Sequence, residues 1–408
     1  MKFRLNKYSD KLTGTVNLES SKSESNRALI VNALAGGAGE LSHLSNARDT
    51  NTMLALLSSN EEVLDVKDAG TTMRFLTAYL AVTGTGQIIT GTDRMKKRPI
   101  GPLVDALRQL GATIEFLEEE GYPPLRIHKI KKQQTNLIRI PGNISSQYIS
   151  ALMMIAPTLP NGLSIELTTE VFSRPYIELT IALMEKFGVN VVFQEKTIHV
   201  DSQRYVATDH EIEGDWSGAS YWFGFTALAP EESSLELPRI YAHSPQGDHV
   251  IAKIMAEMGV LSTFSPGKVT LQNSPTKATS LNIDFRNCPD LAQTVMAIGA
   301  VSGITLNMTG LESLKIKETD RIEAMRTELA KLGAVLQENG SKWILRPSSR
   351  IPESIEVDTY EDHRMAMAFA PLSQIMDVTI DDPSVVNKSY PGFWDEVRKL
   401  GVKIEEIN

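Results

Sequence analysis

Apolar and polar residues follow a helical period in a segment that recurs along the chain. Each copy has an amphipathic stretch, then a glycine, then a short apolar stretch typical of a strand. The glycines stand at positions 111, 188, 259, 333 and 401, a period of roughly 70 residues that indicates a repeated unit. A sixth, weaker copy covers residues 51–60 and has Asn60 in place of the glycine. We expect each of these residues to end its helix in the left-handed conformation.

A second family of helices lies between these copies and is apolar on all sides, which is typical of buried helices. Its members are predicted to begin near Ser23, Gly70, Ser145, Ser217, Pro289 and His363. Each unit therefore holds one buried helix, one amphipathic helix and a few strands. Six such units predict an α/β protein with two domains of three units each.

The domain boundary is predicted at a break rich in Gly, Asp and Ser, residues 213–218. The strand-like segment 11–18 precedes the first buried helix and is expected to complete the C-terminal domain. This prediction gives one domain of residues 19–216, and a second of residues 217–408 together with 1–18. The chain would then cross between the domains twice, at two neighbouring points.

Composition narrows the class of protein. The 408 residues are 42% hydrophobic and carry a net charge of −9, which argues against a general nucleic-acid or anionic-membrane binder. The single cysteine, Cys288, excludes an internal disulfide and a zinc site built on cysteines. Residues 1–7 lack the apolar core of a signal peptide, and the most apolar windows, 149–159 and 291–304, are too short to span a bilayer. We expect a soluble cytoplasmic protein.

Polar and charged side chains gather at the predicted helix starts. Residues 20–27 combine four serines with Lys22 and Arg27, and a helix N-terminus attracts anions. If all these helix starts face one cleft between the domains, the cleft would bind more than one phosphate or carboxylate. The cations concerned are Lys22, Arg98, Arg321, Arg364 and Lys388, and the carboxylates available for acid–base chemistry are Asp290, Glu318 and Asp362.

Each motif also has an ordinary interpretation when taken alone. Ser145 and Ser173 are typical N-caps, residues 93–98 a solvated run of charge, and residues 317–321 local ion pairs of a helix. The Gly70 motif lacks the lysine of a P-loop, and a metal at His363 has no second nearby histidine. Cys288 is expected to be inert. Recurrence at one phase of six repeats favours a binding function over these separate explanations.

Eight motifs, in this order, resemble the 5-enolpyruvylshikimate-3-phosphate (EPSP) synthase family across nearly the whole chain. They are residues 21–27, 69–74, 93–99, 145–147, 173–176, 317–321, 362–367 and Lys388. The resemblance implies two similar domains, each of three βαβαββ units in an inside-out α/β barrel, with the active site in the interdomain cleft. It implies transfer of the enolpyruvyl group of phosphoenolpyruvate to the 5-hydroxyl of shikimate 3-phosphate, without metal or organic cofactor. Apart from the resemblance, we expect a monomer.

The resemblance also assigns roles to residues. The shikimate 3-phosphate site would comprise Lys22, Ser23, Arg27, Ser145, Ser146, Gln147, Ser173, Tyr176, Asp290 and Lys317, with the serines 145, 146 and 173 on the phosphate. The phosphoenolpyruvate site would comprise Lys22, Gly70, Arg98, Gln147, Arg321, Arg364 and Lys388. Asp290 would take the 5-hydroxyl proton, Glu318 would protonate the methylene carbon, and Lys22 would lie near the bridging oxygen. Thr71, Asp362 and His363 would support these groups.

Several positions depart from the commonest family pattern, namely Asp68, Phe75, Arg174 and Ser313. Two alternatives stay open at this point. One is the sister enzyme that transfers enolpyruvyl to UDP-N-acetylglucosamine, which typically carries a reactive loop cysteine; Cys288 lies instead beside the expected base. The other is a non-catalytic protein of the same fold that binds phosphorylated metabolites, for which proton-transferring carboxylates would have no use.

Overall fold

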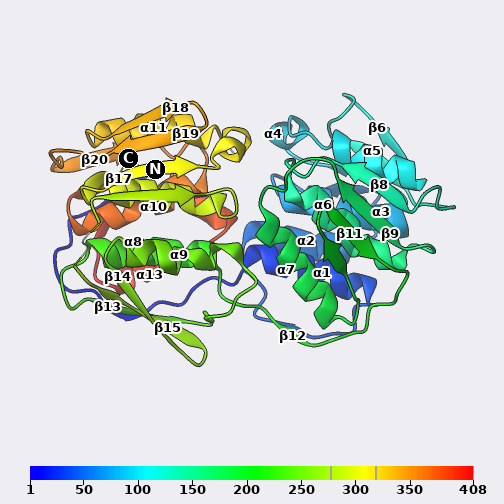
Figure 1. The fold of residues 1–408 in the computed structure, drawn as a ribbon, viewed down its shortest axis with the longest axis horizontal. Coiled ribbons are helices and arrows are strands. Elements are labelled where there is room, and N and C mark those ends of the chain that lie inside the picture. The colour runs from blue at the N-terminus through cyan, green and yellow to red at the C-terminus, as the bar shows by residue number, and fades with distance from the viewer. Residues whose placement is uncertain (276–277, 318, 408) are drawn as a thin grey trace. The chain divides into compact units, whose positions relative to one another are not determined.

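The structure is a computed structural model that describes residues 1–275, 278–317 and 319–407. It divides into two compact units (Figure 1). Unit 1 comprises Met1–Glu19 and Glu213–Asn408, and unit 2 comprises Ser20–Ile212. The predicted domain boundaries, at 18–19 and 216–217, stay a prediction about where separately folding domains divide.

Unit 2, coloured blue to green in Figure 1, contains two four-stranded sheets and one two-stranded sheet. The sheet orders are β4-β5-β7-β6, β10-β11-β9-β8 and β12-β3. Its main helices are α1 (Lys22–Leu34), α2 (Arg48–Leu57), α3 (Gly70–Thr83), α4 (Asp93–Lys96), α5 (Gly101–Leu110), α6 (Ser146–Ile155) and α7 (Arg174–Lys186). Its strands are β3 (Leu41–Ser42), β4 (Val63–Asp65), β5 (Thr85–Thr90), β6 (Thr113–Phe116), β7 (Leu125–His128), β8 (Leu137–Ile140), β9 (Leu163–Leu167), β10 (Val192–Gln194), β11 (Thr197–Val200) and β12 (His210–Glu211).

Unit 1 contains three four-stranded sheets, of orders β14-β15-β13-β2, β16-β17-β19-β18 and β20-β21-β1-β22. Its main helices are α8 (Trp216–Leu228), α9 (Ile251–Ala256), α10 (Ala292–Val301), α11 (Arg321–Lys331), α12 (His363–Phe369) and α13 (Phe393–Lys399). The 3-10 turns that matter below are η2 (Gly247–Val250), η3 (Pro289–Leu291), η4 (Glu312–Ile316) and η6 (Pro383–Lys388). The strands are β1 (Lys2–Leu5), β2 (Thr13–Thr15), β13 (Ser234–Pro238), β14 (Val260–Ser265), β15 (Lys268–Asn273), β16 (Ser280–Asp284), β17 (Thr305–Thr309), β18 (Val335–Asn339), β19 (Lys342–Arg346), β20 (Ser354–Val357), β21 (Asp377–Asp381) and β22 (Ile404–Ile407).

One order of elements recurs in both units: strand, buried helix, parallel strand, amphipathic helix, then antiparallel strands. It is complete for β4 to β7, β8 to β11 and β16 to β19. Two sheets of unit 1 are completed by the first residues of the chain, because β2 pairs parallel to β13 and β1 lies between β21 and β22. The α/β class and the repeated units are therefore confirmed, and the segment 11–18 does complete a sheet of unit 1.

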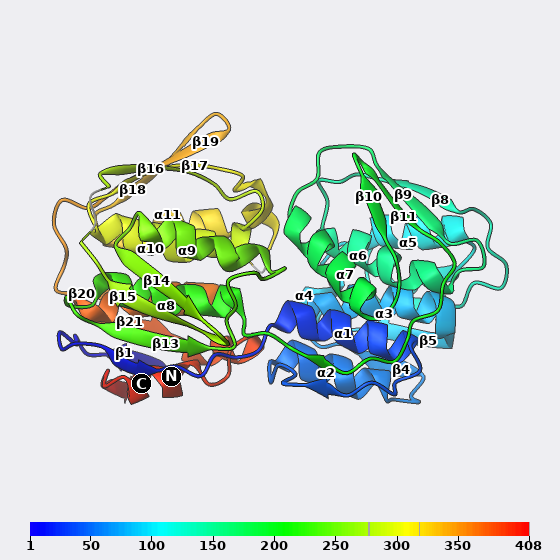
Figure 2. The same cartoon turned by 60° about the horizontal axis from the view of Figure 1, so that its bottom comes forward.

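The apolar helices form the core of each unit. Helices α1, α3 and α6 of unit 2 and α8, α10 and α12 of unit 1 are buried along most of their length. Figure 2 shows α8 and α10 enclosed between the sheets of unit 1. Sheets outside and helices inside is the arrangement expected of all-round apolar helices, because their every face needs a packing partner.

The five glycines of the repeat all adopt positive φ, from 80° at Gly188 to 109° at Gly111. After α7, the N–H of Gly188 bonds to the carbonyl of Glu185 and the N–H of Val189 to that of Met184, which is the Schellman pattern. The prediction for Asn60 is wrong. Helix α2 ends at Leu57 and leaves through Ser58 with φ −93°, so no left-handed residue is needed there.

Strand β1 was not expected from the sequence. Phe3 and Leu5 point into the core while Lys2 and Arg4 are more exposed, but four residues are too few for a period of two to be recognised. No helix in the described part of the chain is long and apolar enough to cross a membrane.

Candidate functional site

Arg27 contacts residues in the first two turns of four helices in unit 2. Its guanidinium donates to Thr180 Oγ1 on α7 (2.8 Å), to Ser150 Oγ on α6 (3.2 Å) and to the carbonyl of Ser23 on α1 (2.8 Å). It also lies over the rings of Phe75 on α3 and Tyr176 on α7, at 5.3 and 5.7 Å. Since each of these residues stands within two turns of its helix start, four helix N-termini lie at the same end of unit 2.

Two of these helix starts are joined directly. The amide of Gln147, in the first turn of α6, donates to Thr71 Oγ1 in the first turn of α3, at 3.0 Å. Ser145 caps α6 by accepting from the N–H of Gln147. The structure thus brings together Gln147 and Thr71, which the sequence placed 76 residues apart.

Gly70 begins α3 against two arginines. A Cβ at this position would lie 2.5 Å from Nη1 of Arg98 and 2.8 Å from Nη1 of Arg74. Arg74 in turn donates to the carbonyls of Gly70 (2.9 Å) and Pro99 (3.3 Å). The missing side chain therefore lets two guanidinium groups approach a helix N-terminus, which favours an anion at this place.

The predicted phosphate-binding serines differ in what they do locally. Ser145 is an N-cap by its side chain and Ser146 is buried in the first turn. Ser173 is the N-cap residue of α7, yet its side chain makes no capping hydrogen bond and its φ is +56°. A non-glycine residue held in this region is uncommon and is a feature of functional loops.

Lys22, the first residue of α1, pairs with the buried carboxylate of Asp49 on α2 at 3.5 Å. Ser21 caps the helix by accepting from the N–H of Glu24. Lys22 is thereby oriented by a carboxylate that the sequence did not single out.

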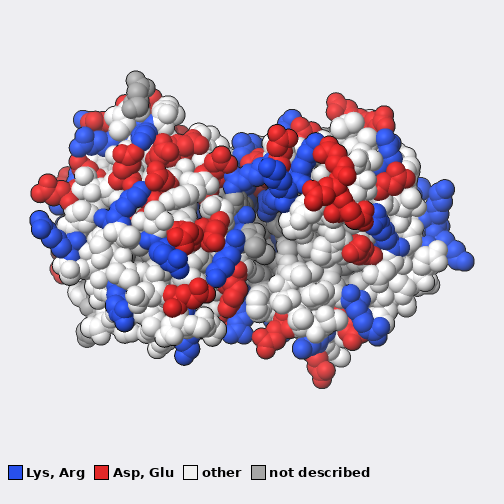
Figure 3. All heavy atoms as spheres, turned by 90° about the horizontal axis from the view of Figure 1, so that it is seen from above, with Lys and Arg blue, Asp and Glu red and all other residues white. Residues whose placement is uncertain are grey.

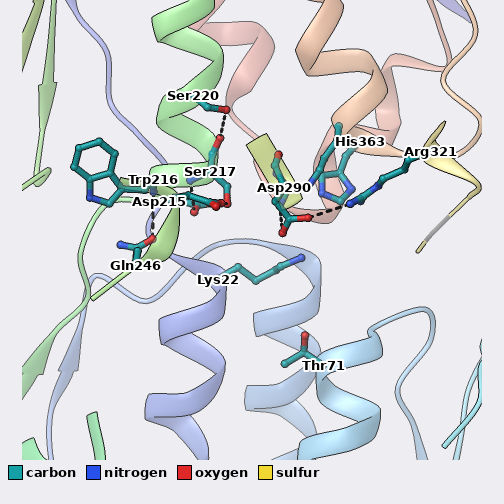
Figure 4. A network of polar contacts seen from close by, with 12 residues as sticks. Lys22, Thr71, Asp215, Trp216, Ser217, Ser220, Gln246, Asp290, Arg321 and His363 are labelled. Carbon is teal, nitrogen blue, oxygen red and sulfur yellow. Dashed lines mark hydrogen bonds and ion pairs between the residues drawn. The ribbon is translucent and has the colours of Figure 1, made fainter. Parts of the chain in front are cut away.

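Unit 1 carries a buried cluster of alternating charge around Asp290 in η3 (Figure 4). Arg321, the first residue of α11, donates to Asp290 Oδ1 at 3.0 Å. Arg364, in the first turn of α12, pairs with the other carboxylate oxygen at 2.8 Å and donates to the Asp290 carbonyl at 3.3 Å. Asp290 is 14% exposed and Arg321 2% exposed, so these charges interact with little screening.

Asp362 supports both arginines. Its carboxylate accepts from Arg321 Nε at 2.7 Å and caps α12 by accepting from the N–H of Arg364 at 2.9 Å. His363 Nδ1 lies 3.7 Å from the same carboxylate. The ordinary interpretation of residues 320–321 as a local ion pair does not describe this helix start, because Asp320 caps α11 while Arg321 reaches across to Asp290 and Asp362.

Two further predicted residues are described by their position and burial. Lys388 ends η6 and is buried, and Lys317 follows η4 and is half-buried. Glu318, the expected proton donor, lies outside the described residues.

Sequence reasoning missed a polar network beneath Asp290. Tyr221 on α8 has its hydroxyl 3.3 Å from Arg364 Nη1, and burial raises the pKa of Tyr221 to about 12. Asp248 in η2 is buried and accepts a hydrogen bond from Ser217. Burial, reinforced by the negative charge of Asp290, raises the pKa of Asp248 to about 7. Tyr221 and Ser217 stand in an apolar helix, and only their positions four residues apart hinted at a shared face.

Other chemistries find less support. Burial raises the pKa of the Cys288 thiol above its usual range, which agrees with an inert thiol because the thiolate is the nucleophile. Within residues 1–275, 278–317 and 319–407, no three His, Cys, Asp or Glu side chains are grouped as metal ligands. The face drawn in Figure 3 carries both signs of charge on each unit.

Comparison with known proteins shows which family the chain resembles. The model of the EPSP synthase (3-phosphoshikimate 1-carboxyvinyltransferase) family matches residues 7–59 and 57–397. A 3-phosphoshikimate 1-carboxyvinyltransferase of Bacteroides fragilis (strain YCH46) is 46% identical over 398 residues, which are 97% of each chain. One from Vibrio cholerae serotype O1 (strain M66-2) is 36% identical over 421 residues, covering 95% of this chain and 97% of the relative.

Among solved structures, EPSP synthase from Acinetobacter baumannii superposes with a TM-score of 0.80 at 19% identity, covering 99% of both chains. At that identity the likeness concerns the fold. The matched family model and the full-length relatives carry the conclusion that this chain belongs to the EPSP synthase family.

Proposed function

We propose that this protein transfers the enolpyruvyl group of phosphoenolpyruvate to the 5-hydroxyl of shikimate 3-phosphate, releasing phosphate. The observation that carries the proposal, beside the family, is a partly buried carboxylate, Asp290, held between the guanidinium groups of Arg321 and Arg364. Asp290 would thus be a proton acceptor among groups that bind anions. Pure binding of a phosphorylated metabolite would be weakened by such a carboxylate, because it repels the ligand.

Asp290 is the proposed base. Two guanidinium groups on a carboxylate stabilise its charged form and so weaken it as a base. When Arg321 and Arg364 donate hydrogen bonds to the carboxylate or phosphate of phosphoenolpyruvate, they stabilise the charged form of Asp290 less. Binding of the second substrate would thus prepare Asp290 to accept the 5-hydroxyl proton of the first.

The bond changes follow an addition and an elimination. The 5-oxygen forms a bond to C2 of phosphoenolpyruvate as Asp290 takes its proton, and the methylene carbon C3 gains a proton from Glu318. The C2–O bond to phosphate then breaks and phosphate leaves, while Glu318, now deprotonated, takes a proton back from C3 and the double bond is restored. Lys22 is proposed to offset negative charge at the bridging oxygen, since such fixed charges stabilise a developing anion.

The other binding roles are proposals on the same basis. Ser145, Ser146 and Ser173 would hold the phosphate of shikimate 3-phosphate, and Gly70 and Arg98 would contact phosphoenolpyruvate. The remaining proposed ligands are Ser23, Arg27, Gln147, Tyr176, Lys317 and Lys388, with Thr71, Asp362 and His363 in support. Since neither unit alone holds both the serines and the base, we propose that both units act on one pair of substrates.

The test is a turnover assay on the purified full-length chain. Phosphoenolpyruvate and shikimate 3-phosphate together should release inorganic phosphate and give a product heavier by one enolpyruvyl group, and chelators should not change the rate. Asp290→Asn should lower kcat by about 100-fold or more. Release with UDP-N-acetylglucosamine in place of shikimate 3-phosphate would refute the assignment in favour of the sister enzyme, and binding without turnover would favour a non-catalytic protein.

The proposal also covers the location, the oligomeric state and the domains of the protein. We propose a cytoplasmic monomer of two domains, residues 19–216, and 217–408 together with 1–18. Sedimentation at a mass well above 45.0 kDa would contradict the monomer.

A further inference from the structure

Asp248 is a buried carboxylate outside the proposed substrate-binding and catalytic groups. It lies in η2 and is 4% exposed. Ser217, in the first turn of α8, donates a hydrogen bond to its Oδ2. Such a charge is costly to bury and is usually retained for a reason of function or specificity.

Helix α8 connects this carboxylate to the proposed base. Ser217 and Tyr221 are four residues apart, so they lie on the same face of α8. Ser217 contacts Asp248, while the Tyr221 hydroxyl lies 3.3 Å from Arg364 Nη1. Arg364 in turn pairs with Asp290 at 2.8 Å.

We propose that Asp248 is a positioning residue that keeps Asp290 basic, because its buried negative charge opposes the guanidinium group of Arg364, which pairs with Asp290. This inference rests on the proposed function of Asp290 as the base. Asp248 itself would touch neither substrate.

The charges that face Asp248 come from several elements. Asp290 of η3 and Asp215, the N-cap of α8, raise the pKa of Asp248, while Arg364 of α12 lowers it. Cys288, just before η3, also interacts with Asp248, and its pKa is raised in part by that carboxylate. On the neighbouring segment, His249 bonds the carbonyl of Gln246, and Lys253 of α9 is exposed.

The interaction between Asp248 and Asp290 acts in both directions. Burial and then the charge of Asp290 raise the pKa of Asp248 to about 7. By the same electrostatic coupling, ionised Asp248 raises the proton affinity of Asp290. A base with higher proton affinity accepts the substrate proton more readily, provided that it is unprotonated at the working pH.

The first experiment is the pH dependence of the single-turnover rate with phosphoenolpyruvate and shikimate 3-phosphate, from about pH 5 to 9. Asp248→Asn keeps the shape and can still accept from Ser217, but it removes the charge. The rate at pH 8 should fall about three- to tenfold, because Asp290 becomes a weaker base. The part of the acid limb that follows the ionisation of Asp248, at about pH 7 in the wild type, should be lost.

Ser217→Ala supplies a variant with the opposite expectation. It keeps the Asp248 charge but removes a hydrogen bond that favours it, so the acid limb should move to higher pH. Glu328→Gln is the matched control, since it removes another buried carboxylate, bonded to Tyr360 on a different part of unit 1. Its profile should equal that of the wild type. Equal profiles for Asp248→Asn and wild type, or the same shift in Glu328→Gln, would overturn the proposal.

A second measurement needs no activity. In protein labelled with ¹³C-carboxyl aspartate, the signal missing from Asp248→Asn identifies Asp248. Its titration midpoint should fall in Asp290→Asn, since a neighbouring negative charge is removed. An unchanged midpoint would refute the coupling. If the wild-type enzyme shows no turnover, the proposed function fails while this titration still decides whether the two carboxylates are coupled.

Discussion

Gly70 shows how one absent side chain makes room for the guanidinium groups of the proposed phosphoenolpyruvate site. A methyl group here would overlap the guanidinium groups of Arg98 and Arg74. We expect Gly70→Ala to displace Arg98 and to raise the KM for phosphoenolpyruvate about tenfold or more, because small displacements of binding groups are costly. Steady-state kinetics check this.

Gly101→Ala is the control for this prediction. Gly101 also begins a helix, α5, but the nearest atom to an added Cβ is 3.4 Å away. Its KM should match the wild type. An unchanged KM in Gly70→Ala would mean that Arg98 does not contact this substrate.

The sequence could indicate which residues are candidates for binding anions, but not which side chains hold those residues in place. Asp320 before Arg321 marks a helix start, and the structure agrees. The partners of Arg321 lie 31 and 41 residues away, at Asp290 and Asp362. Such pairs depend on the packing of separate helices, which no local pattern specifies. Asp248 was missed for the same reason, since only its burial distinguishes it from a surface aspartate.

The helix ends of the repeat can be tested at Gly188, after α7. Its φ is +80°, and an added Cβ would lie 3.0 Å from Val206 Cγ2. Gly188→Ala should lower the free energy of unfolding by about 1–2 kcal/mol, because a Cβ is strained in the left-handed region. Gly188→Asn should cost less, since asparagine tolerates this conformation better.

Urea unfolding of the three proteins gives the comparison. The expected order of stability is Gly, then Asn, then Ala. An alanine variant as stable as the wild type would show that the left-handed cap contributes nothing to this helix.

Long elements with strong periodicity were predictable, and short ones were not. The buried helices begin within a few residues of the predicted starts, because caps and apolar runs are local signals. Strand β1 and the two-stranded sheet of β12 and β3 were missed. Strands of two to four residues are formed by their partners rather than by their own pattern.

Stability of the molecule should depend on pH through Asp248. The folded pKa is raised from 3.8 to about 7, so the folded state binds more protons than the unfolded state between these values. Its stability must therefore fall as pH rises through this window. Asp248→Asn removes the effect, so its Tm should exceed that of the wild type more at pH 8 than at pH 4.5.

The measurement is Tm against pH for both proteins, with scattering to exclude aggregation. The expected gain in the free energy of unfolding of Asp248→Asn at pH 8 is on the order of a few kcal/mol. A difference in Tm that stays constant from pH 4.5 to 8 would show that Asp248 has no raised pKa in the folded protein.

The six repeats could be counted from the sequence because glycines and apolar helices return at one phase. That the segment 11–18 completes unit 1 followed from its position before the first buried helix. The arrangement of the two units stays a prediction from family resemblance, as does the cleft between them.

The earliest strands of this chain to be synthesised pair with strands that are synthesised much later. Strands β1 and β2 are made first, yet β2 pairs with β13 and β1 with β21 and β22, whose residues leave the ribosome more than 200 positions later. Unit 2 is one continuous segment, Ser20–Ile212, so all of its helices and strands are synthesised before β13. During translation residues 1–19 therefore have no strand partners while unit 2 can already fold. Unit 1 is completed last.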